Sequence, residues 1–284
     1  MNKSDLDIVF LGLAQNCQKF INRFFKVVYK ISKQKNIKVI IGENNSDDFT
    51  FNEIHKNVLN KLGMLEFVDT TFIEKFDDRI HRLAAARQQL KKQLLASKLK
   101  PKYVCVVDLD DVLNDNFNEQ LIFNLIDKLN SSNDKHFAVS VKSQPYYYDI
   151  LNFESSEFPN DQIKQLQNNK TLKSYRLRKK KIYDIQKIIT EYKSFECISA
   201  FNGLCLYNYI DFIKADYLEF SKDVTPEHLY LNREIFNNTK KKILVCDYYL
   251  QMPLEHKPLD NILLFIFEKL KKYISIFFDR VFAN

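Results

Sequence analysis

Short apolar runs and longer amphipathic stretches alternate along the first third of the chain. Residues 7–13 form a short, largely apolar run that predicts a strand, and the apolar positions of residues 20–31 recur three and four apart, which predicts a helix. The same order repeats with a strand pattern at 37–41, a helix pattern at 51–62, a strand pattern at 65–72 and a helix pattern at 77–97. This alternation indicates an α/β sheet.

The next strand is the most informative one. Residues 103–107, Tyr-Val-Cys-Val-Val, are uniformly apolar, as expected of a strand buried on both faces, and they lead directly into Asp108-Leu-Asp-Asp. The run at 37–41 likewise ends in a polar, acidic turn, Gly-Glu-Asn-Asn-Ser-Asp-Asp. Ligands of open α/β sheets bind beyond the carboxyl ends of the strands, so both acidic turns are predicted to lie at a binding site.

The remaining patterns complete one large domain, which we assign to residues 1–256. They predict a helix at 118–129, a strand at 138–141, a polar region with a helix at 154–193, core segments at 199–207 and 243–249, and a helix at 227–236. Residues 257–284 mix large apolar residues with lysines and an arginine, which predicts an amphipathic helical tail. The tail is too charged to span a bilayer, and it suits a membrane interface or packing against the domain or a second copy.

Composition removes several function classes. The chain has 43 Lys and Arg against 36 Asp and Glu, a net charge of +7, which suits an anionic ligand or a membrane surface. This charge is low for a dedicated nucleic-acid-binding protein, so we expect no nucleic-acid partner. Only four glycines are present, and none begins a phosphate-binding loop of the P-loop or dinucleotide type. The sequence also lacks the H-x-x-x-H pair of zinc hydrolases and the G-x-S-x-G motif of serine hydrolases.

The cysteines and the N-terminus suggest a compartment. Five cysteines, odd in number and widely spaced, favour neither a disulfide framework nor a cysteine-ligated zinc site. The N-terminal segment begins with acidic residues and has only a short apolar stretch, which predicts neither a signal peptide nor a membrane anchor. We therefore expect a cytoplasmic protein that can attach to the inner face of a membrane through its tail.

Asp108 and Asp110 are the sharpest candidates for chemistry. Three carboxylates within four residues repel one another, and at the end of a buried strand they are costly unless a cation neutralises them. Aspartate oxygens suit Mg²⁺ or Mn²⁺, which in turn would bind the phosphates of a substrate. The alternative is an acidic turn followed by a helix cap at Asn114 or Asp115. The apolar strand before the motif favours the metal site.

Two further groups are candidates for nucleotide contacts. Glu43, Asn44 and Asp48 follow an early strand and could hydrogen-bond a ribose or base, although such residues are also common in ordinary turns. Arg79 and Arg87 lie eight residues apart on a predicted helix, about 80° apart around its axis, so they can share a side that faces a phosphate. A solvated basic stripe is the alternative interpretation of these arginines.

Glu227 and His228 are candidates for catalysis. They follow Pro226 at a predicted helix start, where the carboxylate can act as a base and the imidazole as a ligand or proton carrier. A solvated capping turn would use the same residues. His256 follows the last strand and is a candidate third metal ligand, with a structural histidine as the alternative.

Taken in order, these features resemble a GT-A-fold glycosyltransferase. Such enzymes begin with a strand, carry a nucleotide-binding acidic turn after the second strand, and place a D-x-D motif after a central apolar strand, as residues 8–13, 43–48 and 104–110 do here. More narrowly, Arg79-x-x-x-Leu-Ala-x-x-Arg87 resembles the R-x-x-x-L-A-x-x-R-N pattern of the capsule-associated mannosyltransferase family, with Gln88 in place of its Asn. Residues 147–149, 199–203 and 227–229 are similar to later motifs of that family, so the resemblance spans residues 7–256.

This resemblance implies a Rossmann-type mixed sheet flanked by helices, and transfer of a sugar from a nucleoside-diphosphate sugar to a glycan or lipid-linked acceptor in surface polysaccharide or glycoconjugate synthesis. It places the donor diphosphate on Mn²⁺ or Mg²⁺ held by Asp108 and Asp110, supplemented by Arg79 or Arg87. The other implied contacts are the nucleoside with Leu13, Glu43 and Asp48, and the acceptor or donor sugar with Tyr148, Asp149, Asn202 and Gly203. Glu227 is implied as the base of an inverting reaction or as a group that orients the acceptor in a retaining one.

Two other function classes stay open. A D-x-D phosphatase or a nucleotidyltransferase also handles phosphates at the strand ends of an α/β sheet, although the phosphatase motif usually lies early in the chain. The third class is a non-catalytic protein that binds a membrane surface or nucleic acid through the basic residues 176–181 and the tail. Clustered cations are more often a solvated face.

Overall fold

The computed structural model describes residues 6–161, 163, 172–217, 225–253 and 256. The chain divides into two compact units, Met1–Pro253 and Leu254–Asn284, and the fold below is that of the first unit. His256 is the one described residue of the second unit. The amphipathic helix that the sequence predicts at 257–284 lies outside the described residues.

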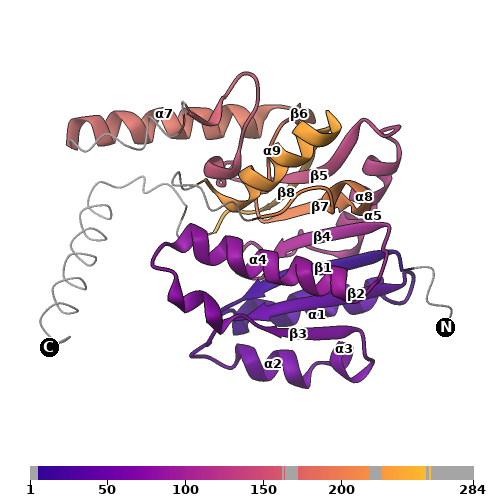
Figure 1. Cartoon of the computed structure of the whole chain (residues 1–284). Helices are drawn as coiled ribbons and strands as arrows, with labels where there is room; N and C mark the ends of the chain where they lie inside the picture. Colours follow the sequence, from indigo (N-terminus) through magenta and orange to yellow (C-terminus); the bar gives the residue numbers. More distant parts are fainter. Residues whose placement is uncertain (1–5, 162, 164–171, 218–224, 254–255, 257–284) are drawn as a thin grey trace, which may run out of the picture. The chain divides into compact units, whose positions relative to one another are not determined.

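An eight-stranded mixed sheet forms the centre of the first unit, with strand order β3-β2-β1-β4-β7-β5-β8-β6 (Figure 1). Four strands on one side run parallel to one another: β1 (Ile8–Ala14), β2 (Ile37–Glu43), β3 (Leu65–Asp69) and β4 (Tyr103–Asp108). The others are β5 (His136–Gln144), β6 (Phe195–Cys197), β7 (Leu204–Asn208) and β8 (Lys242–Gln251). β7 runs antiparallel to both β4 and β5, and therefore joins the parallel half to the rest of the sheet.

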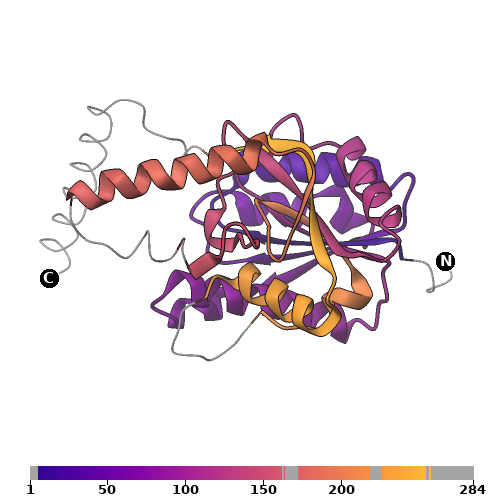
Figure 2. The ribbon, with the colours of Figure 1, turned by 90° about the horizontal axis from the view of Figure 1, so that it is seen from above.

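Helices cover both faces of this sheet (Figure 2). One core holds side chains of α1 (Gln18–Ile31), α2 (Thr50–Lys56), α3 (Val58–Lys61) and α5 (Glu119–Asn130). The other holds side chains of α4 (Arg79–Ala96), α7 (Leu172–Glu191), α8 (Tyr209–Phe212) and α9 (Glu227–Thr239). Two short 3₁₀ helices, η1 (Thr71–Lys75) and η2 (Ile150–Asn152), lie in the connections. The α/β fold predicted from the sequence is confirmed.

Alternation within the central strands explains the two cores. In β1, Ile8 and Phe10 enter the first core, whereas Val9 and Leu11 enter the second, because successive side chains of a strand point to opposite faces. All four side chains are at least 98% buried. A strand covered on both faces needs such a continuous apolar run, which is why the sequence pattern identified β1 and β4.

Two local predictions, and one alternative interpretation, were wrong. The single helix at 51–62 is divided into α2 and α3 at Asn57, whose extended backbone ends α2 and whose side chain accepts a hydrogen bond from Leu59 N at 2.9 Å. The strand at 65–72 ends at Asp69, and 3₁₀ helix η1 follows. The cap of α5 is Asn118, which accepts from Leu121 N, and not Asn114 or Asp115.

The structure also bears on the cysteines and on membrane insertion. All five cysteines are buried and unpaired. Within the described residues, no helix combines the length and the apolar character needed to cross a bilayer.

Candidate functional site

The carboxyl ends of β1, β2 and β4 meet at one edge of the sheet. In the register of the parallel strands, Leu13 lies beside both Gly42 and Asp108. Glu43 follows Gly42 at the end of β2. The two acidic turns of the sequence therefore adjoin, as expected for parallel strands that share a sheet edge.

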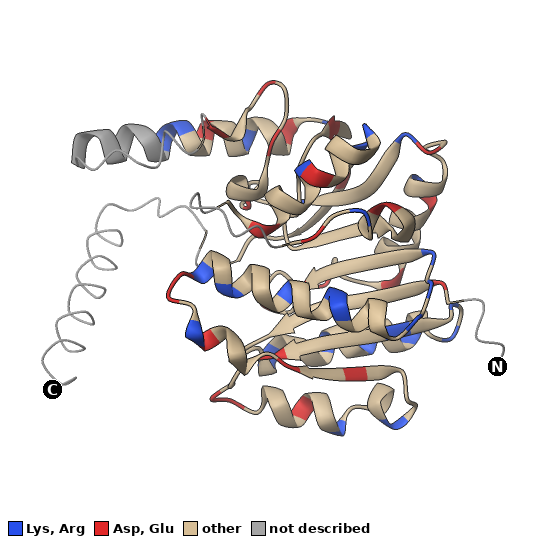
Figure 3. Cartoon of the chain, viewed as in Figure 1, with Lys and Arg blue, Asp and Glu red and all other residues tan. Residues whose placement is uncertain are grey.

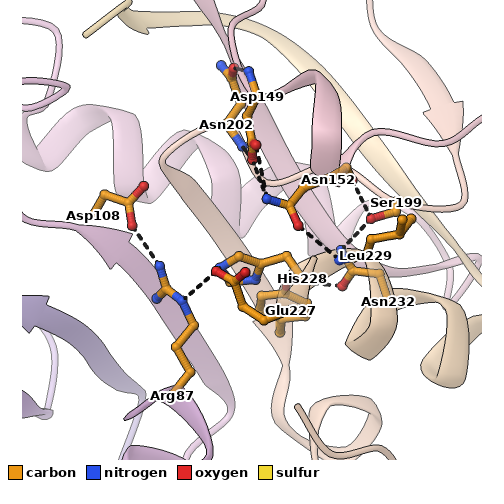
Figure 4. Close-up of polar contacts among 11 residues, drawn as sticks. Arg87, Asp108, Asp149, Asn152, Ser199, Asn202, Glu227, His228, Leu229 and Asn232 are labelled. Atoms are coloured by element: carbon orange, nitrogen blue, oxygen red, sulfur yellow. Dashed lines mark hydrogen bonds and ion pairs between the residues drawn. The ribbon is translucent and has the colours of Figure 1, made fainter. Parts of the chain in front are cut away.

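Arg87 connects two of the predicted carboxylates. It lies on α4, which carries several basic residues along its length (Figure 3). Its guanidinium Nη2 is 2.7 Å from Asp108 Oδ1, and its Nε is 3.3 Å from Glu227 Oε1, as Figure 4 shows. The guanidinium also lies 5.1 Å from the ring centroid of Phe201. The arginine side chain is 5% exposed and that of Glu227 is 6% exposed, so this ion pair is largely removed from water.

Burial and charge act in opposite directions at this cluster. Burial raises the pKa of Glu227, and the Arg87 guanidinium counteracts that rise. Burial disfavours the charged form of Arg87, but the carboxylates of Asp108 and Glu227 outweigh it and raise the pKa of the guanidinium. The arginine is therefore held as a cation between two carboxylates.

His228 packs behind this cluster. Its ring is stacked on Phe201 at 3.6 Å between centroids and 11° between planes, and its side chain is fully buried. Burial, followed by the positive charge of Arg87, moves the pKa of His228 well below its ordinary value. Neither ring nitrogen has a hydrogen-bond partner among the described residues. The imidazole is thus neutral, and its assignment to catalysis stays a prediction.

Asn202 and Gly203 form a turn that reaches the D-x-D segment. Both have positive φ angles, 54° and 84°, a backbone conformation that glycine adopts freely and asparagine tolerates. The carbonyl of Gly203 accepts a hydrogen bond from Asp108 N at 2.9 Å. A Cβ at Gly203 would lie 2.9 Å from the Tyr148 hydroxyl, so glycine is also required by the close packing of that tyrosine.

The same turn holds the 148–149 segment. The side-chain oxygen of Asn202 accepts hydrogen bonds from the backbone nitrogens of Tyr148 and Asp149 at 3.2 and 3.4 Å. In return, Asn202 N donates to Asp149 Oδ2 at 3.2 Å. The structure therefore brings together all four residues predicted to form a sugar pocket, and places them next to Asp108.

Asp149 is linked to α9 through Asn152, which the sequence analysis missed. Asn152 Nδ2 donates to both carboxylate oxygens of Asp149, at 2.9 and 3.2 Å, and Asn152 Oδ1 accepts from Leu229 N at 3.1 Å in the first turn of α9 (Figure 4). Burial raises the pKa of Asp149 to about 7, although these donors lower it. The only sign of Asn152 in the sequence was its position three residues after Asp149, which was already a predicted site residue.

The residues predicted to contact a nucleoside are used in different ways. Glu43 Oε1 accepts from Ser46 N at 2.7 Å, which closes the turn after β2. Asp48 accepts from the backbone nitrogens of Gln18 and Thr50, and so supports the starts of α1 and α2. The side-chain oxygen of Asn44 is buried and has no partner among the described residues. Asn44 therefore has a buried acceptor that a ligand could satisfy.

Two further predicted site residues, Arg79 and His256, have no assigned place in the Arg87 cluster. Arg79 is exposed at the first turn of α4, about 12 Å along the helix from Arg87. His256 belongs to the second unit of the chain. The assignments of Arg79 to phosphate and of His256 to a metal stay predictions.

Asp108 and Asp110 carry carboxylate oxygens, the ligand type that a hard divalent cation prefers. Asp110 is exposed, and one of its oxygens accepts from Val112 N at 3.2 Å. In the described part of the chain, no cluster of three or more His, Cys, Asp or Glu side chains is arranged for a metal. Two carboxylates are nevertheless sufficient for Mg²⁺ or Mn²⁺ when substrate phosphates and water supply the other ligands.

Gln88 and Lys91, one turn of α4, hold residues 212–217 against the site. Gln88 Oε1 accepts from Tyr217 N at 2.8 Å, and Gln88 Nε2 donates to Asp216 Oδ1 at 2.9 Å. The fully buried Lys91 donates to the carbonyls of Phe212 and Ala215. In the sequence, Gln88 stands out only as a departure from a family pattern, and the segment that it holds was not predicted.

Comparison with known proteins gives structural matches without sequence relatives. No protein-family model and no curated protein sequence matches the chain. Glucosyl-3-phosphoglycerate synthase from Mycobacterium tuberculosis, solved with Mn²⁺, UDP and glucosyl-3-phosphoglycerate, is 11% identical with a TM-score of 0.51, and the match covers 90% of this chain and 74% of the synthase. Residues 1–349 of S. aureus TarS in complex with UDP are 12% identical with a TM-score of 0.50, and the match covers 88% of this chain.

The chain spans between 59% and 62% of the matched TarS chains. At such low identity the likeness concerns the fold. The narrower resemblance to capsule-associated mannosyltransferases stays a prediction. The eight-stranded mixed sheet with helices on both faces is the GT-A glycosyltransferase fold.

Proposed function

We propose that this chain is a metal-dependent glycosyltransferase that transfers a sugar from a nucleoside-diphosphate sugar to a glycan or lipid-linked acceptor. In its narrower form, the proposal is that the transferred sugar is a hexose. The observation that carries the proposal is the buried Arg87 between Asp108 of the D-x-D segment and Glu227 of α9. A cluster of buried charges at the strand ends of an α/β sheet is typical of a catalytic site. The GT-A fold supports the same reaction class.

The donor would lie across the ends of β1, β2 and β4. Leu13, Glu43, Asn44 and Asp48 border the place proposed for the nucleoside, and Asp108 and Asp110 would hold Mn²⁺ or Mg²⁺ beside the diphosphate. The cation, when bound, offsets the negative charge that develops on the leaving diphosphate. Arg79 is proposed as an additional phosphate contact at the start of α4.

The acceptor side is assigned to the Asn202–Gly203 turn and the segment that it holds. Tyr148 supplies an aromatic ring for the apolar face of a sugar, and Asp149 and Asn202 supply polar groups for its hydroxyls. Glu227 is proposed to take the proton of the attacking acceptor hydroxyl, because burial raises its pKa towards the range useful for a general base. Arg87 fixes the position of this carboxylate.

We further propose that the protein acts in the cytoplasm, at the inner face of a membrane, in the synthesis of a surface polysaccharide or glycoconjugate. The support is the sequence of residues 257–284, whose apolar and basic residues suit an interfacial helix. A membrane position would give the site access to a lipid-linked acceptor.

A thermal-shift panel tests the proposed reaction class. UDP, GDP, CMP and their common sugar conjugates are each added with and without Mn²⁺, because a ligand that binds the native state raises the apparent stability. We expect a Mn²⁺-dependent rise with one nucleoside diphosphate, which would also identify the base. If no nucleotide shifts the melting temperature and a generic phosphate ester is hydrolysed, the phosphatase alternative replaces the transferase.

A further inference from the structure

Tyr217 places a buried, unpartnered hydroxyl beside the Arg87 cluster. Its side chain is 2% exposed, and its hydroxyl has no hydrogen-bond partner among the described residues. Arg87 Nη1 is likewise buried and without a partner there. A buried polar group that lacks a partner costs free energy, so both atoms are candidates for contacts that a ligand supplies.

Two independent sets of contacts place this tyrosine. Gln88, the residue after Arg87 on α4, accepts the backbone N–H of Tyr217 at 2.8 Å. The Tyr217 ring packs edge-on against His228, with 5.5 Å between centroids and 81° between planes. His228 is in turn stacked on Phe201, the ring over which the Arg87 guanidinium lies. Tyr217 and Arg87 therefore border the same aromatic pair, and the charges of Arg87, Glu227 and Asp108 all act on the tyrosine hydroxyl.

The chemistry of the missing ligand follows from these neighbours. Tyr217 Oη and Arg87 Nη1 can both donate a hydrogen bond, and the carboxylates of Glu227 and Asp108 beside them can accept one. A phosphate oxygen suits the two donors but has no proton for the carboxylates and is repelled by their charge. A hydroxyl group accepts two hydrogen bonds and donates one, so it matches this combination.

We propose that the Tyr217 hydroxyl and Arg87 Nη1 bind a hydroxyl group of the transferred sugar, which makes Tyr217 a residue for recognition of the donor sugar. This inference rests on the proposed function, because the sugar arrives as a nucleoside-diphosphate conjugate. The inference adds Tyr217 as a residue that contacts the sugar and makes no contact with the nucleotide.

The test is Tyr217→Phe, which removes one oxygen and keeps the ring. Titration calorimetry with Mn²⁺ compares UDP and GDP with UDP-glucose, UDP-N-acetylglucosamine and GDP-mannose. We expect unchanged affinity for the nucleoside diphosphate and about tenfold weaker binding of the preferred sugar conjugate, the effect of one lost hydrogen bond. The melting temperature without ligand should stay the same or rise, since the variant no longer buries an unpartnered hydroxyl.

Tyr207→Phe is the matched control. The Tyr207 hydroxyl is also buried but contacts Asn232 Oδ1 at 3.1 Å, so its removal should lower the melting temperature and leave sugar-conjugate binding unchanged. Equal binding of the conjugate by wild type and Tyr217→Phe overturns the inference alone. Equal weakening of nucleotide and conjugate also overturns it, because the hydroxyl would then contact the nucleotide. The inference also fails if the wild type binds a nucleotide and binds none of its sugar conjugates more tightly than that nucleotide. If the wild type binds none of the probes, the proposed function is overturned as well.

Discussion

Arg87 and Glu227 are 140 residues apart in the chain, yet Nε of the first lies 3.3 Å from Oε1 of the second. The contact joins α4 to the first turn of α9, and the same guanidinium reaches Asp108 at the end of β4. Three segments of the sequence that carry candidate chemistry thus share one cation. The position of the predicted base therefore depends on a residue that was first singled out for phosphate binding.

Arg87→Ala should destabilise the fold strongly. The substitution leaves Glu227 buried without its cation, and breaking a buried ion pair costs about 3 to 5 kcal/mol of unfolding free energy. Urea denaturation measures the effect. Arg23→Ala is the control, because Arg23 pairs with Asp115 across 2.7 Å but the two side chains are 39% and 96% exposed, and such pairs contribute about 0 to 1 kcal/mol. Similar losses for both variants would contradict a special role for the buried pair.

Asp110→Asn should remove the response to metal without affecting the fold. Asp110 is exposed, so the melting temperature without ligand should not change, whereas the Mn²⁺-dependent shift with nucleotide should disappear. Turnover should fall by at least about a hundredfold, because a catalytic cation contributes several kcal/mol to the barrier. Asp115→Asn removes the same charge from a nearby exposed position and should behave as wild type. Full turnover of Asp110→Asn, or of the wild type in EDTA, would exclude the metal role.

The sequence pattern was sufficient to predict the central strands of the sheet. It was insufficient to predict the shortest strands and helices. β1 and β4 are buried on both faces, so their apolar runs are unambiguous, and the run of β2 is interrupted only by Lys38. β6 has three residues and α8 has four, too few for any period to be recognised. The break at Asn57 depends on one extended residue between two helical patterns, which periodicity alone does not reveal.

In the candidate site, too, some residues could be predicted from the sequence and others could not. Asp108 could be placed at the sheet edge from sequence, because the carboxyl end of a parallel strand has only one location. Gln88 and Tyr217 are 129 residues apart, and Asn152 and Leu229 are 77 apart, so their hydrogen bonds arise from the tertiary fold. Tyr217 and Asn152 belong to none of the motifs found in the sequence, and the pattern around Gln88 gives no sign of its partner. Sequence therefore singled out the charged groups at the sheet edge and missed the contacts by which Gln88 and Asn152 position their neighbours.

Removal of residues 259–284 should abolish binding to anionic vesicles. The segment has three lysines and one arginine against three acidic residues, among many large apolar residues. Its apolar residues can enter the membrane interface, and each basic residue near an anionic surface contributes about 1 kcal/mol. Sedimentation with vesicles that contain phosphatidylserine measures the loss, with vesicles of neutral lipid as the control. Nucleotide-induced thermal shifts should be the same with and without the segment. Unchanged sedimentation of the shortened chain would contradict a membrane role for the tail.

Asp149→Asn should become more stabilising, relative to wild type, as pH rises. Burial raises the pKa of Asp149 from 3.8 to about 7, so the folded state binds a proton that the unfolded state has lost between these values. Wild-type stability therefore falls across this interval and levels off above pH 7. Asparagine does not titrate, and the variant's advantage over wild type should grow by about 1 to 3 kcal/mol between pH 5 and pH 8, measured by urea denaturation.

Asp69→Asn is the control for this titration, because the pKa of Asp69 is lowered whereas that of Asp149 is raised. Hydrogen bonds from Thr71 lower the pKa of Asp69, so this carboxylate is ionised in both the folded and unfolded states throughout the interval from pH 5 to pH 8. Its substitution should change stability by the same amount at both pH values. The stability difference between Asp149→Asn and wild type could instead be equally independent of pH. That result would mean that Asp149 is ionised in the folded protein at pH 5, and that the hydrogen bonds from Asn152 and Asn202 outweigh the effect of burial on its pKa.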